Sequence, residues 1–145
     1  MPSAARALCD AGPLIALFDL SDEAHGRCAG ALKTFTGRFV TTWPVLTEAF
    51  HFIDHPKDRS LLWNFVLSDV VRVEDVLATD LERMRLLMEQ YADLPMDFAD
   101  ASLVVLAERL KVYRIFTLDR RGFGVFRPRH AHGFEIFPRP DKIAG

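Results

Sequence analysis

The sequence has little of what marks secreted, membrane-bound or disulfide-rich proteins. It contains only two cysteines, Cys9 and Cys28, among its 145 residues, too few for the disulfide framework of a small secreted domain. No segment approaches the roughly 20 consecutive apolar residues that a membrane-spanning helix requires, and the apolar run that begins at Ala101 ends before Glu108. We therefore expect a cytoplasmic protein that does not insert into a membrane.

An excess of charge of one sign is also missing. The formal net charge is -2 at pH 7, so the chain as a whole exerts no strong attraction on nucleic acids. Half of the residues are hydrophobic and 26% are charged, a balance that fits a globular core and excludes a disordered chain, a collagen-like repeat or a coiled coil. The sequence shows no repeat, low-complexity tract or Ser/Gly linker, so residues 1–145 are predicted to form a single domain.

Short β-type runs alternate with longer helical patterns along the chain. We expect strands over 5–9, 38–42, 70–73, 113–118 and 133–137. We expect helices over 14–20, from 21 to near 37, from 44 to before 56, and over 60–67, 79–91 and 98–110. Ser21 is interpreted as an N-cap, and Thr79 begins a capping-box pattern with Glu82. Because helices separate the strands, the pattern predicts an α/β protein whose parallel sheet is covered on both faces.

Acidic residues follow several of the predicted strands. Asp10 ends the first strand and Asp119 ends the fourth, while Glu48 lies one turn into the helix that leaves the second. Asp97 and Asp100 are three residues apart at the start of the last long helix, and therefore share a face. In parallel sheets, ligands bind beyond the carboxyl ends of the strands. We therefore expect these acids to meet at that edge.

Carboxylates that meet in one place repel one another and resist joint ionisation. A hard divalent cation relieves this repulsion, and oxygen ligands favour Mg²⁺ or Mn²⁺. Each acid also has an ordinary structural interpretation. Asp10 fits a strand-end turn, Glu48 a solvated helix face, Asp97 an N-cap, Asp100 a first-turn acid stabilised by the helix dipole, and Asp119 a turn acid paired with arginine. Their joint placement is what favours a metal site.

Four segments carry a family resemblance, in order along the chain. They are residues 9–17 (CDAGPLIAL), 42–49 (TWPVLTEA), 94–103 (LPMDFADASL) and 115–123 (IFTLDRRGF). With these segments the sequence resembles the PIN-domain ribonucleases and, within them, the VapC-type toxins of VapBC toxin–antitoxin pairs. The resemblance implies a three-layer α/β/α sandwich with a mainly parallel central sheet of about five strands.

The resemblance also implies an activity, a site and partners. It implies an endoribonuclease that uses Mg²⁺ or Mn²⁺, together with an RNA substrate, a homodimer and a cognate antitoxin. The family's metal-binding acidic positions fall on Asp10, Glu48, Asp100 and Asp119. Asp97 matches a less constant catalytic acid, and Thr117 a small hydroxyl residue near the site. The cation would activate water for attack on the phosphodiester, with Asp97 or Glu48 as a candidate general base.

Positive charge is concentrated near the C-terminus. From residue 114 onward, the sequence contains seven basic residues and only three acids, Asp119, Glu135 and Asp141. The basic residues are Arg114, Arg120, Arg121, Arg127, Arg129, Arg139 and Lys142. Arg120 and Arg121, which follow Asp119 directly, are candidates for contacts with substrate phosphates. A solvated arginine-rich loop is the alternative.

Other interpretations of the acidic edge stay open at the level of sequence. A receiver-like signalling domain also gathers acids around Mg²⁺, but Asp10 has no acidic neighbour and arginines follow Asp119. A haloacid-dehalogenase-like phosphatase needs Asp-x-Asp, which residues 10–12 lack. A PIN fold that acts only as a binding module is a third possibility.

Two further features are interpreted as structural. The His51 and His55 pair lacks the glutamate of a zinc metalloprotease motif, so surface histidines are favoured. Cys9 is expected to be a buried strand residue rather than a nucleophile. Trp63 and Phe65 are candidates for an exposed apolar dimer surface.

Overall fold

A five-stranded parallel sheet forms the centre of the molecule. The computed structural model describes residues 5–140, and its strands have the order β3-β2-β1-β4-β5. Their bounds are β1 (Arg6–Cys9), β2 (Arg38–Thr42), β3 (Val71–Glu74), β4 (Arg114–Phe116) and β5 (Glu135–Phe137). β1 is the middle strand, so Asp10, the residue after it, lies at the centre of the sheet's carboxyl edge.

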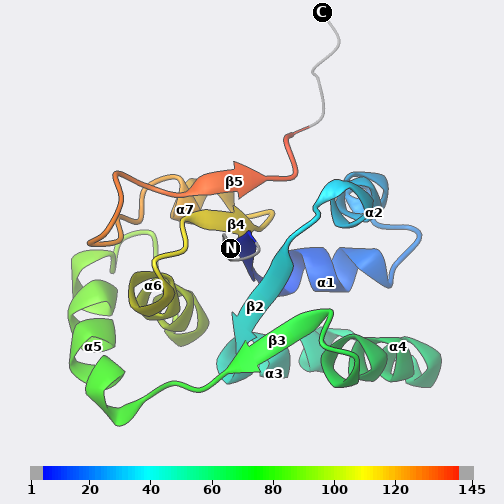
Figure 1. Cartoon of the computed structure of the whole chain (residues 1–145), viewed down its shortest axis with the longest axis horizontal. Helices are drawn as coiled ribbons and strands as arrows, with labels where there is room; N and C mark the ends of the chain where they lie inside the picture. Colours follow the sequence, from blue (N-terminus) through cyan, green and yellow to red (C-terminus); the bar gives the residue numbers. More distant parts are fainter. Residues whose placement is uncertain (1–4, 141–145) are drawn as a thin grey trace, which may run out of the picture.

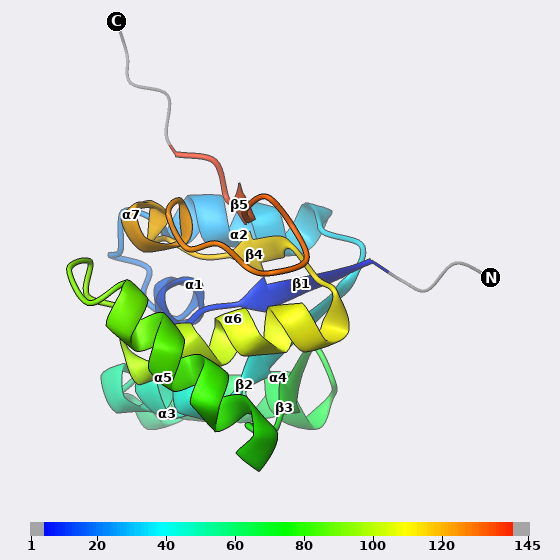
Figure 2. The ribbon, with the colours of Figure 1, turned by 90° about the vertical axis from the view of Figure 1, so that its left-hand side faces the viewer.

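Helices connect the strands and form the outer layers. They are α1 (Ala11–Leu17), α2 (His25–Thr34), α3 (Trp43–Phe52), α4 (Pro56–Leu67), α5 (Leu81–Gln90), α6 (Phe98–Leu110) and α7 (Arg120–Phe123), with a 3₁₀ turn, η1 (Ala78–Asp80), before α5. α5 and α6 cover one side of the sheet, whereas α1, α2 and α4 lie on the other (Figure 1). Figure 2 shows α5 and α6 side by side in front of the sheet. This arrangement confirms the expected α/β/α fold with five strands.

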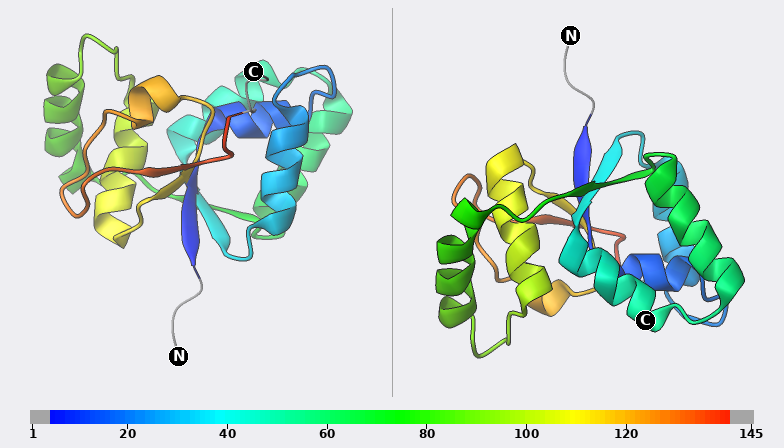
Figure 3. Two further views of the ribbon diagram at one scale, coloured as in Figure 1. Left: turned by 90° about the horizontal axis from the view of Figure 1, so that it is seen from above. Right: turned by 90° about the horizontal axis from the view of Figure 1, so that it is seen from below.

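The carboxyl edge of the sheet is where several helices begin. α1 follows β1 directly, α3 follows β2, and α3 lies between α1 and α6, contacting both (Figure 3). Side chains carried on α1, α3, α6 and α7 are therefore brought together at one end of the molecule.

Among residues 5–140, no helix has both the length and the hydropathy needed to cross a membrane.

α6 supplies the largest part of the core. Its residues from Ala101 to Ala107 are all buried, which confirms the helix predicted over 98–110. Burial of a helix on all sides requires apolar residues around its whole circumference, as the sequence has here. Phe98, its first residue, is 48% exposed, whereas Asp100 and residues 108–110 are partly buried.

Two predicted helix caps were wrong. Ser21 does not cap α2, because its hydroxyl donates a hydrogen bond to Asp19 Oδ1 (2.6 Å) and the helix begins four residues later, at His25. Thr79 does not form a capping box with Glu82, since the carboxylate of Asp80 accepts the backbone N–H of Leu77 (2.9 Å) and a 3₁₀ turn precedes α5. In both places a neighbouring aspartate forms a local hydrogen bond that the predicted capping pattern does not include.

Other boundaries also shifted. α1 covers Ala11–Leu17, three residues before the predicted 14–20, because Asp10 caps it at Ala11. Pro56 begins α4, earlier than the residue-60 start that was predicted, and α7 was not predicted at all. The last two strands are shorter than predicted, at three residues each.

A partly buried ion pair joins α5 to α6 and to the loop that precedes β5. Arg83 donates two hydrogen bonds to Glu108 (3.1 and 2.9 Å), and the backbone N–H of Arg129 donates a third (2.7 Å). Burial acts to raise the pKa of Glu108, but these hydrogen bonds and the charge of Arg83 outweigh it and lower the pKa. This stabilisation is therefore present above the unfolded-state pKa of Glu108 and is lost as the pH falls through its lower folded-state pKa.

Glu108→Gln is expected to lower the free energy of unfolding by about 1–3 kcal/mol at neutral pH, because it leaves the donors of Arg83 with a neutral partner. Urea denaturation measures the change. Glu89→Gln is the matched control, since Glu89 pairs with Arg85 on an exposed helix face, and its effect should stay below about 0.5 kcal/mol. Equal effects of the two substitutions would contradict the assignment.

Candidate functional site

Three helices at the carboxyl edge are capped by aspartates. Asp10 Oδ1 accepts the N–H of Ala11 (2.8 Å), and Asp119 Oδ1 accepts the N–H of Gly122 (2.9 Å). Asp97 Oδ1 accepts the N–H of Asp100 (2.8 Å). Asp97 therefore adopts the N-cap geometry that was predicted for it. The caps also hold each carboxylate in a fixed orientation at the ends of α1, α6 and α7.

Thr117 connects two of these acids. It is fully buried, its hydroxyl donates to Asp10 Oδ2 (2.7 Å), and its oxygen accepts the backbone N–H of Asp119 (3.0 Å). Both oxygens of Asp10 are thus engaged by the protein. A fully buried hydroxyl with two partners orients Asp10 rather than facing solvent, so Thr117 has the geometry of a positioning residue.

Asp97 and Asp100 cap the same helix reciprocally. The N–H of Asp97 donates to Asp100 Oδ2 (3.1 Å), in addition to the bond in the opposite direction. Burial is the largest influence on Asp100, and with the nearby charges of Asp97 and Asp10 it raises the pKa of this carboxyl to about 8, although the backbone hydrogen bond from Asp97 acts the other way. Asp100 is therefore a carboxyl group whose ionised form needs a positive partner.

Glu48 is partly buried in α3 and faces the same acids. Within residues 5–140 it has no hydrogen bond or ion pair. Burial, followed by the negative charges of Asp10 and Asp97, raises its pKa. Glu48 is thus only partly solvated, and the charges near it are those of other acids. Its carboxylate is the one least committed to the protein's own hydrogen bonds.

The acids act on one another electrostatically. Burial raises the pKa of Asp10, and the charges of Asp119 and Asp97 raise it further, although hydrogen bonds from Thr117 and Ala11 oppose the shift. Asp10 also contributes to the raised pKa values of Glu48 and Asp100. The side chains predicted to meet at one sheet edge therefore lie in one electrostatic neighbourhood.

The donor chemistry of this neighbourhood fits a hard divalent cation. The groups that shift one another's pKa here are carboxylates, the ligands that suit Mg²⁺ or Mn²⁺. As they stand, no three acidic, histidine or cysteine side chains among residues 5–140 form a ready chelating group.

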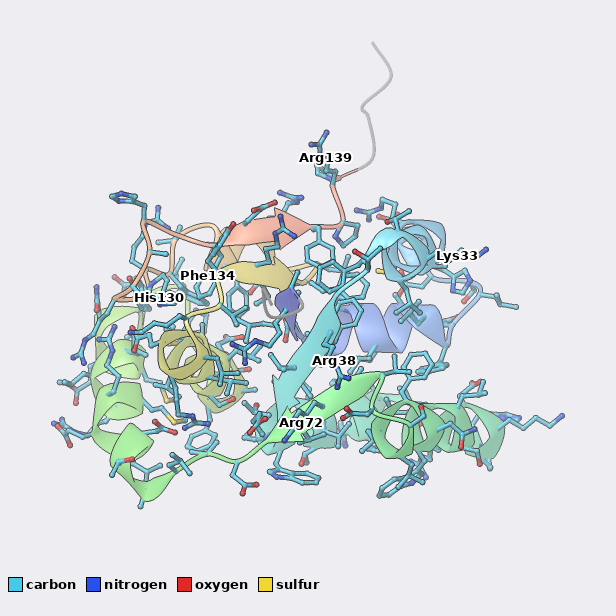
Figure 4. The ribbon with its side chains drawn as sticks, viewed as in Figure 1. Lys33, Arg38, Arg72, His130, Phe134 and Arg139 are labelled. Atoms are coloured by element: carbon cyan, nitrogen blue, oxygen red, sulfur yellow. The ribbon has the colours of Figure 1, made fainter. Side chains whose placement is uncertain are left out.

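The arginines near the site have different environments. Arg120 donates to the carbonyl oxygen of Pro138 (2.8 Å), which ties its guanidinium to the segment after β5, whereas Arg121 is exposed. Arg139 extends away from the body of the molecule beyond β5 (Figure 4). A pocket of about 330 Å³ beside Thr117 is lined by Arg120 and by Arg27 of α2, a residue that the sequence did not single out. Asp141 and Lys142 lie outside the described residues.

A buried pair of hydroxyl groups was also missed. Thr42 and Ser102 are fully buried, with their oxygens 2.6 Å apart, and Ser102 donates in turn to the carbonyl oxygen of Ala99 (2.6 Å). The pair joins the start of α3, which carries Glu48, to α6 one turn after its first residues, close to Asp100. The only signal in the sequence was a serine inside an otherwise apolar run.

The features interpreted as structural have ordinary environments. His51 and His55 are both exposed, and His55 Nδ1 accepts the N–H of Lys57 (3.2 Å) at the start of α4. Cys9 is buried, and burial raises the pKa of its thiol. Of the two residues suggested for a dimer surface, Trp63 is half exposed, whereas the ring of Phe65 packs 5.4 Å from that of Phe18.

The fold and the order of its acids define a family. The sequence model of the family described as PIN domain matches residues 7–126, and the chain belongs to this family. It is 26% identical over 137 residues to Ribonuclease VapC26 of Mycobacterium tuberculosis, which covers 90% of this chain and 99% of that protein. The family match confirms the PIN-domain resemblance, and the receiver-like and phosphatase-like alternatives lose their support.

A solved structure shares the fold. The crystal structure of Mycobacterium tuberculosis VapC20, described as a sarcin-ricin loop cleaving toxin, superposes with a TM-score of 0.71. It is 20% identical in sequence, and the match covers 87% of this chain and 98% of that one. At this level of identity, the similarity shows that the two proteins share a fold and nothing beyond that.

Proposed function

We propose that this protein is a metal-dependent endoribonuclease and the toxin of a type II toxin–antitoxin pair. The observation that carries the proposal is the set of acids at the carboxyl edge, where Asp10, Glu48 and Asp100 each have a pKa raised by burial and by the charges of neighbouring acids. The near full-length match to a ribonuclease of the VapC group supports the activity. The antitoxin partner, a homodimer and a cytoplasmic location follow from the same group resemblance.

Asp10, Glu48, Asp100 and Asp119 are the residues that would hold Mg²⁺ or Mn²⁺. When bound, the ion supplies Lewis acidity at the phosphate and lowers the pKa of water. Thr117 keeps Asp10 in one orientation through its 2.7 Å hydrogen bond. The N-caps of α1 and α7 do the same for one oxygen each of Asp10 and Asp119.

The general base is assigned to Glu48 in preference to Asp97. Asp97 accepts a helix N–H and is engaged in a reciprocal cap with Asp100, whereas Glu48 makes no such bond. Burial raises the pKa of Glu48, which improves its match to proton transfer near neutral pH. Through an oxygen not used on the cation, Glu48 would accept a proton from the attacking water as the water oxygen bonds to phosphorus. The bond to the 3′-oxygen of the ribose breaks, and this oxygen takes up a proton from solvent to give the 3′-hydroxyl.

The substrate phosphates need positive partners because the site itself is acidic. Arg121, exposed beside Asp119, and Arg120, at the adjacent pocket, are the candidates. Contacts of this kind position RNA without reading its sequence.

Purified protein incubated with structured RNAs tests the proposal. Cleavage is expected with Mg²⁺ or Mn²⁺ and should stop when EDTA removes the metal, as gel analysis of the products would show. Products with 5′-phosphate and 3′-hydroxyl ends are expected from attack by water. Cleavage that persists in EDTA would contradict the mechanism.

Thr117→Val is expected to lower kcat about 10–100-fold, the usual cost of losing a group that orients a metal ligand. Valine keeps the shape of threonine but removes the donor to Asp10. Thr117→Ser keeps the hydroxyl and should retain most of the activity, which separates positioning from packing. The pair is compared by initial rates at saturating metal. Equal loss in both variants would assign Thr117 a packing role only.

A further inference from the structure

Four buried hydroxyl residues lie in or next to the segments that carry the acids. They are the only polar residues buried among residues 5–140: Thr41, Thr42, Ser102 and Thr117. Thr41 and Thr42 are the last residues of β2, which leads into α3. Thr117 follows β4, and Ser102 lies in α6. Burial of a hydroxyl group costs free energy unless it is hydrogen-bonded, and each of the four lies within 2.7 Å of a partner.

Thr42 makes a hydrogen bond that its position in the chain does not predict. It is the N-cap residue of α3 and has an extended backbone, the place and conformation in which a threonine hydroxyl ordinarily accepts a helix N–H. Its hydroxyl forms no such cap. Its oxygen lies 2.6 Å from that of Ser102, which in turn donates to the carbonyl oxygen of Ala99 (2.6 Å). Because the Ser102 proton is committed to Ala99, Thr42 is the donor within the pair.

The Thr42–Ser102 pair joins the two helices that carry Glu48 and Asp100. Glu48 lies six residues after Thr42 in α3, and Asp100 lies two residues before Ser102 in α6. Within residues 5–140, no other hydrogen bond links β2 and α3 to α6. The other two acids of the edge are already joined through the hydroxyl of Thr117. Each pair of acids thus has one buried hydroxyl link.

Like charges act to separate the two helices. Burial, and then the charges of Asp10 and Asp97, raise the pKa of Glu48. Asp97 is the N-cap residue of α6, so its ionised form and that of Glu48 repel each other across the two helices. A hydrogen bond has a narrow range of length and angle, whereas the hydrophobic effect has no direction. The bond between the two hydroxyls therefore keeps the helix starts at one separation against this repulsion.

We propose that Ser102, acting through Thr42, is a positioning residue that fixes the separation of Glu48 and Asp100 and thereby sets the affinity of the site for its cation. The inference rests on the proposed metal-dependent function. A contribution to stability alone is the alternative. The two roles differ in one respect, because an apolar pair of similar shape replaces a buried hydrogen-bonded pair with little loss of stability but supplies no fixed direction.

Ser102→Ala and Thr42→Val, alone and combined, separate the two roles. Mn²⁺ affinity is measured from the electron paramagnetic resonance signal of the free ion, and the melting temperature is measured in EDTA. Ser102→Ala is expected to lower the melting temperature, because the buried hydroxyl of Thr42 loses its acceptor. Adding Thr42→Val should recover most of that loss. Mn²⁺ binding should be about tenfold weaker in both single variants, and it should stay so in the double variant.

Two further variants serve as controls. Thr42→Ser keeps the hydroxyl and should bind Mn²⁺ like the parent. Val71→Ala removes buried apolar volume at the start of β3, at the opposite end of the sheet from the acids, so it should lower the melting temperature and leave Mn²⁺ affinity unchanged. The double variant leaves no unpaired hydroxyl, and it decides the question even where Ser102→Ala alone fails to fold.

Three results would overturn the inference. The first is Mn²⁺ affinity in the double variant equal to that of the parent, which would assign the pair to stability alone. The second is loss of Mn²⁺ affinity in Thr42→Ser as large as in Thr42→Val. The third is an equal loss in Val71→Ala, which would mean that affinity merely follows stability.

RNA cleavage by the parent is measured in parallel. A parent that binds Mn²⁺ and cleaves RNA, together with a double variant of unchanged affinity, would overturn only the role of the hydroxyl pair. A parent that neither binds Mn²⁺ nor cleaves RNA would overturn the proposed function, and this inference with it.

Discussion

Asp10→Asn should reduce RNA cleavage more than about 100-fold and leave the fold intact. Groups that only orient metal ligands cost 10–100-fold when removed, and Asp10 is the central carboxylate, in contact with Thr117 and electrostatically coupled to Glu48 and Asp100. Asparagine preserves the size of the side chain and an oxygen to accept the Ala11 N–H. Initial rates with RNA in Mg²⁺ or Mn²⁺ measure the loss.

The same variant should be at least as stable as the parent. Burial and neighbouring acids make the ionised form of Asp10 unfavourable, so removing its charge relieves repulsion while the site loses its function. Asp69→Asn is the matched control, because Asp69 is exposed, precedes β3 at the other end of the sheet and has a φ of 63° that asparagine tolerates. Retained cleavage in Asp10→Asn would show that the acids were assigned to the wrong site.

In the absence of metal, thermal stability should fall as the pH rises from about 5 to 8. Asp100 has a folded-state pKa of about 8 against an ordinary value of 3.8, and Asp10 and Glu48 shift in the same direction. Between those values the folded state holds more protons than the unfolded state, so raising the pH favours unfolding. The stabilisation from Glu108, whose pKa is lowered, is present in full above its unfolded-state pKa, so it stays constant in this range and adds nothing to the slope.

Mn²⁺ should reverse this loss. An ion at about 100 times its dissociation constant adds about 2.7 kcal/mol, which corresponds to roughly 8–10 °C in melting temperature for a chain of this length. The shift should be larger at pH 8 than at pH 5, because metal binding must displace protons from the carboxyl groups. Differential scanning calorimetry with and without EDTA measures both effects.

Asp100→Asn provides the control for this experiment. The variant lacks the carboxyl whose pKa is raised to about 8, so its melting temperature should depend less on pH and respond less to Mn²⁺. A melting temperature that rises with pH in the metal-free parent would contradict the proposed electrostatics. No response to Mn²⁺ at pH 8 would contradict the metal site.

Local sequence signals succeeded where one physical effect dominated. α6 was predicted with its observed bounds because its residues are apolar on every side, and Asp97 was predicted to cap it. The starts of α2 and α5 were mispredicted because Asp19 and Asp80 compete with Ser21 and Thr79 for local backbone groups. Such competition depends on turn geometry that a capping pattern does not contain.

The acidic residues could be chosen from the sequence because a parallel sheet brings strand ends to one edge, and Asp10 and Asp119 each follow a strand. The environment of each acid could not be predicted in this way. The hydroxyl of Thr117 between Asp10 and Asp119, the contact of Thr42 with Ser102, and the exposure of Phe98 depend on side chains from different elements.

The sequence alone thus determined the alternation of strands and helices and the acids that follow the strands, because period and local propensity are properties of neighbouring residues. Only the tertiary structure decided how strongly the acids are buried, which of them keeps its oxygens free, and which buried hydroxyl groups join the helices that carry them. Burial and electrostatic coupling act through space between α1, α3, α6 and α7, and the distances along the chain between these helices say nothing of their separation in the fold.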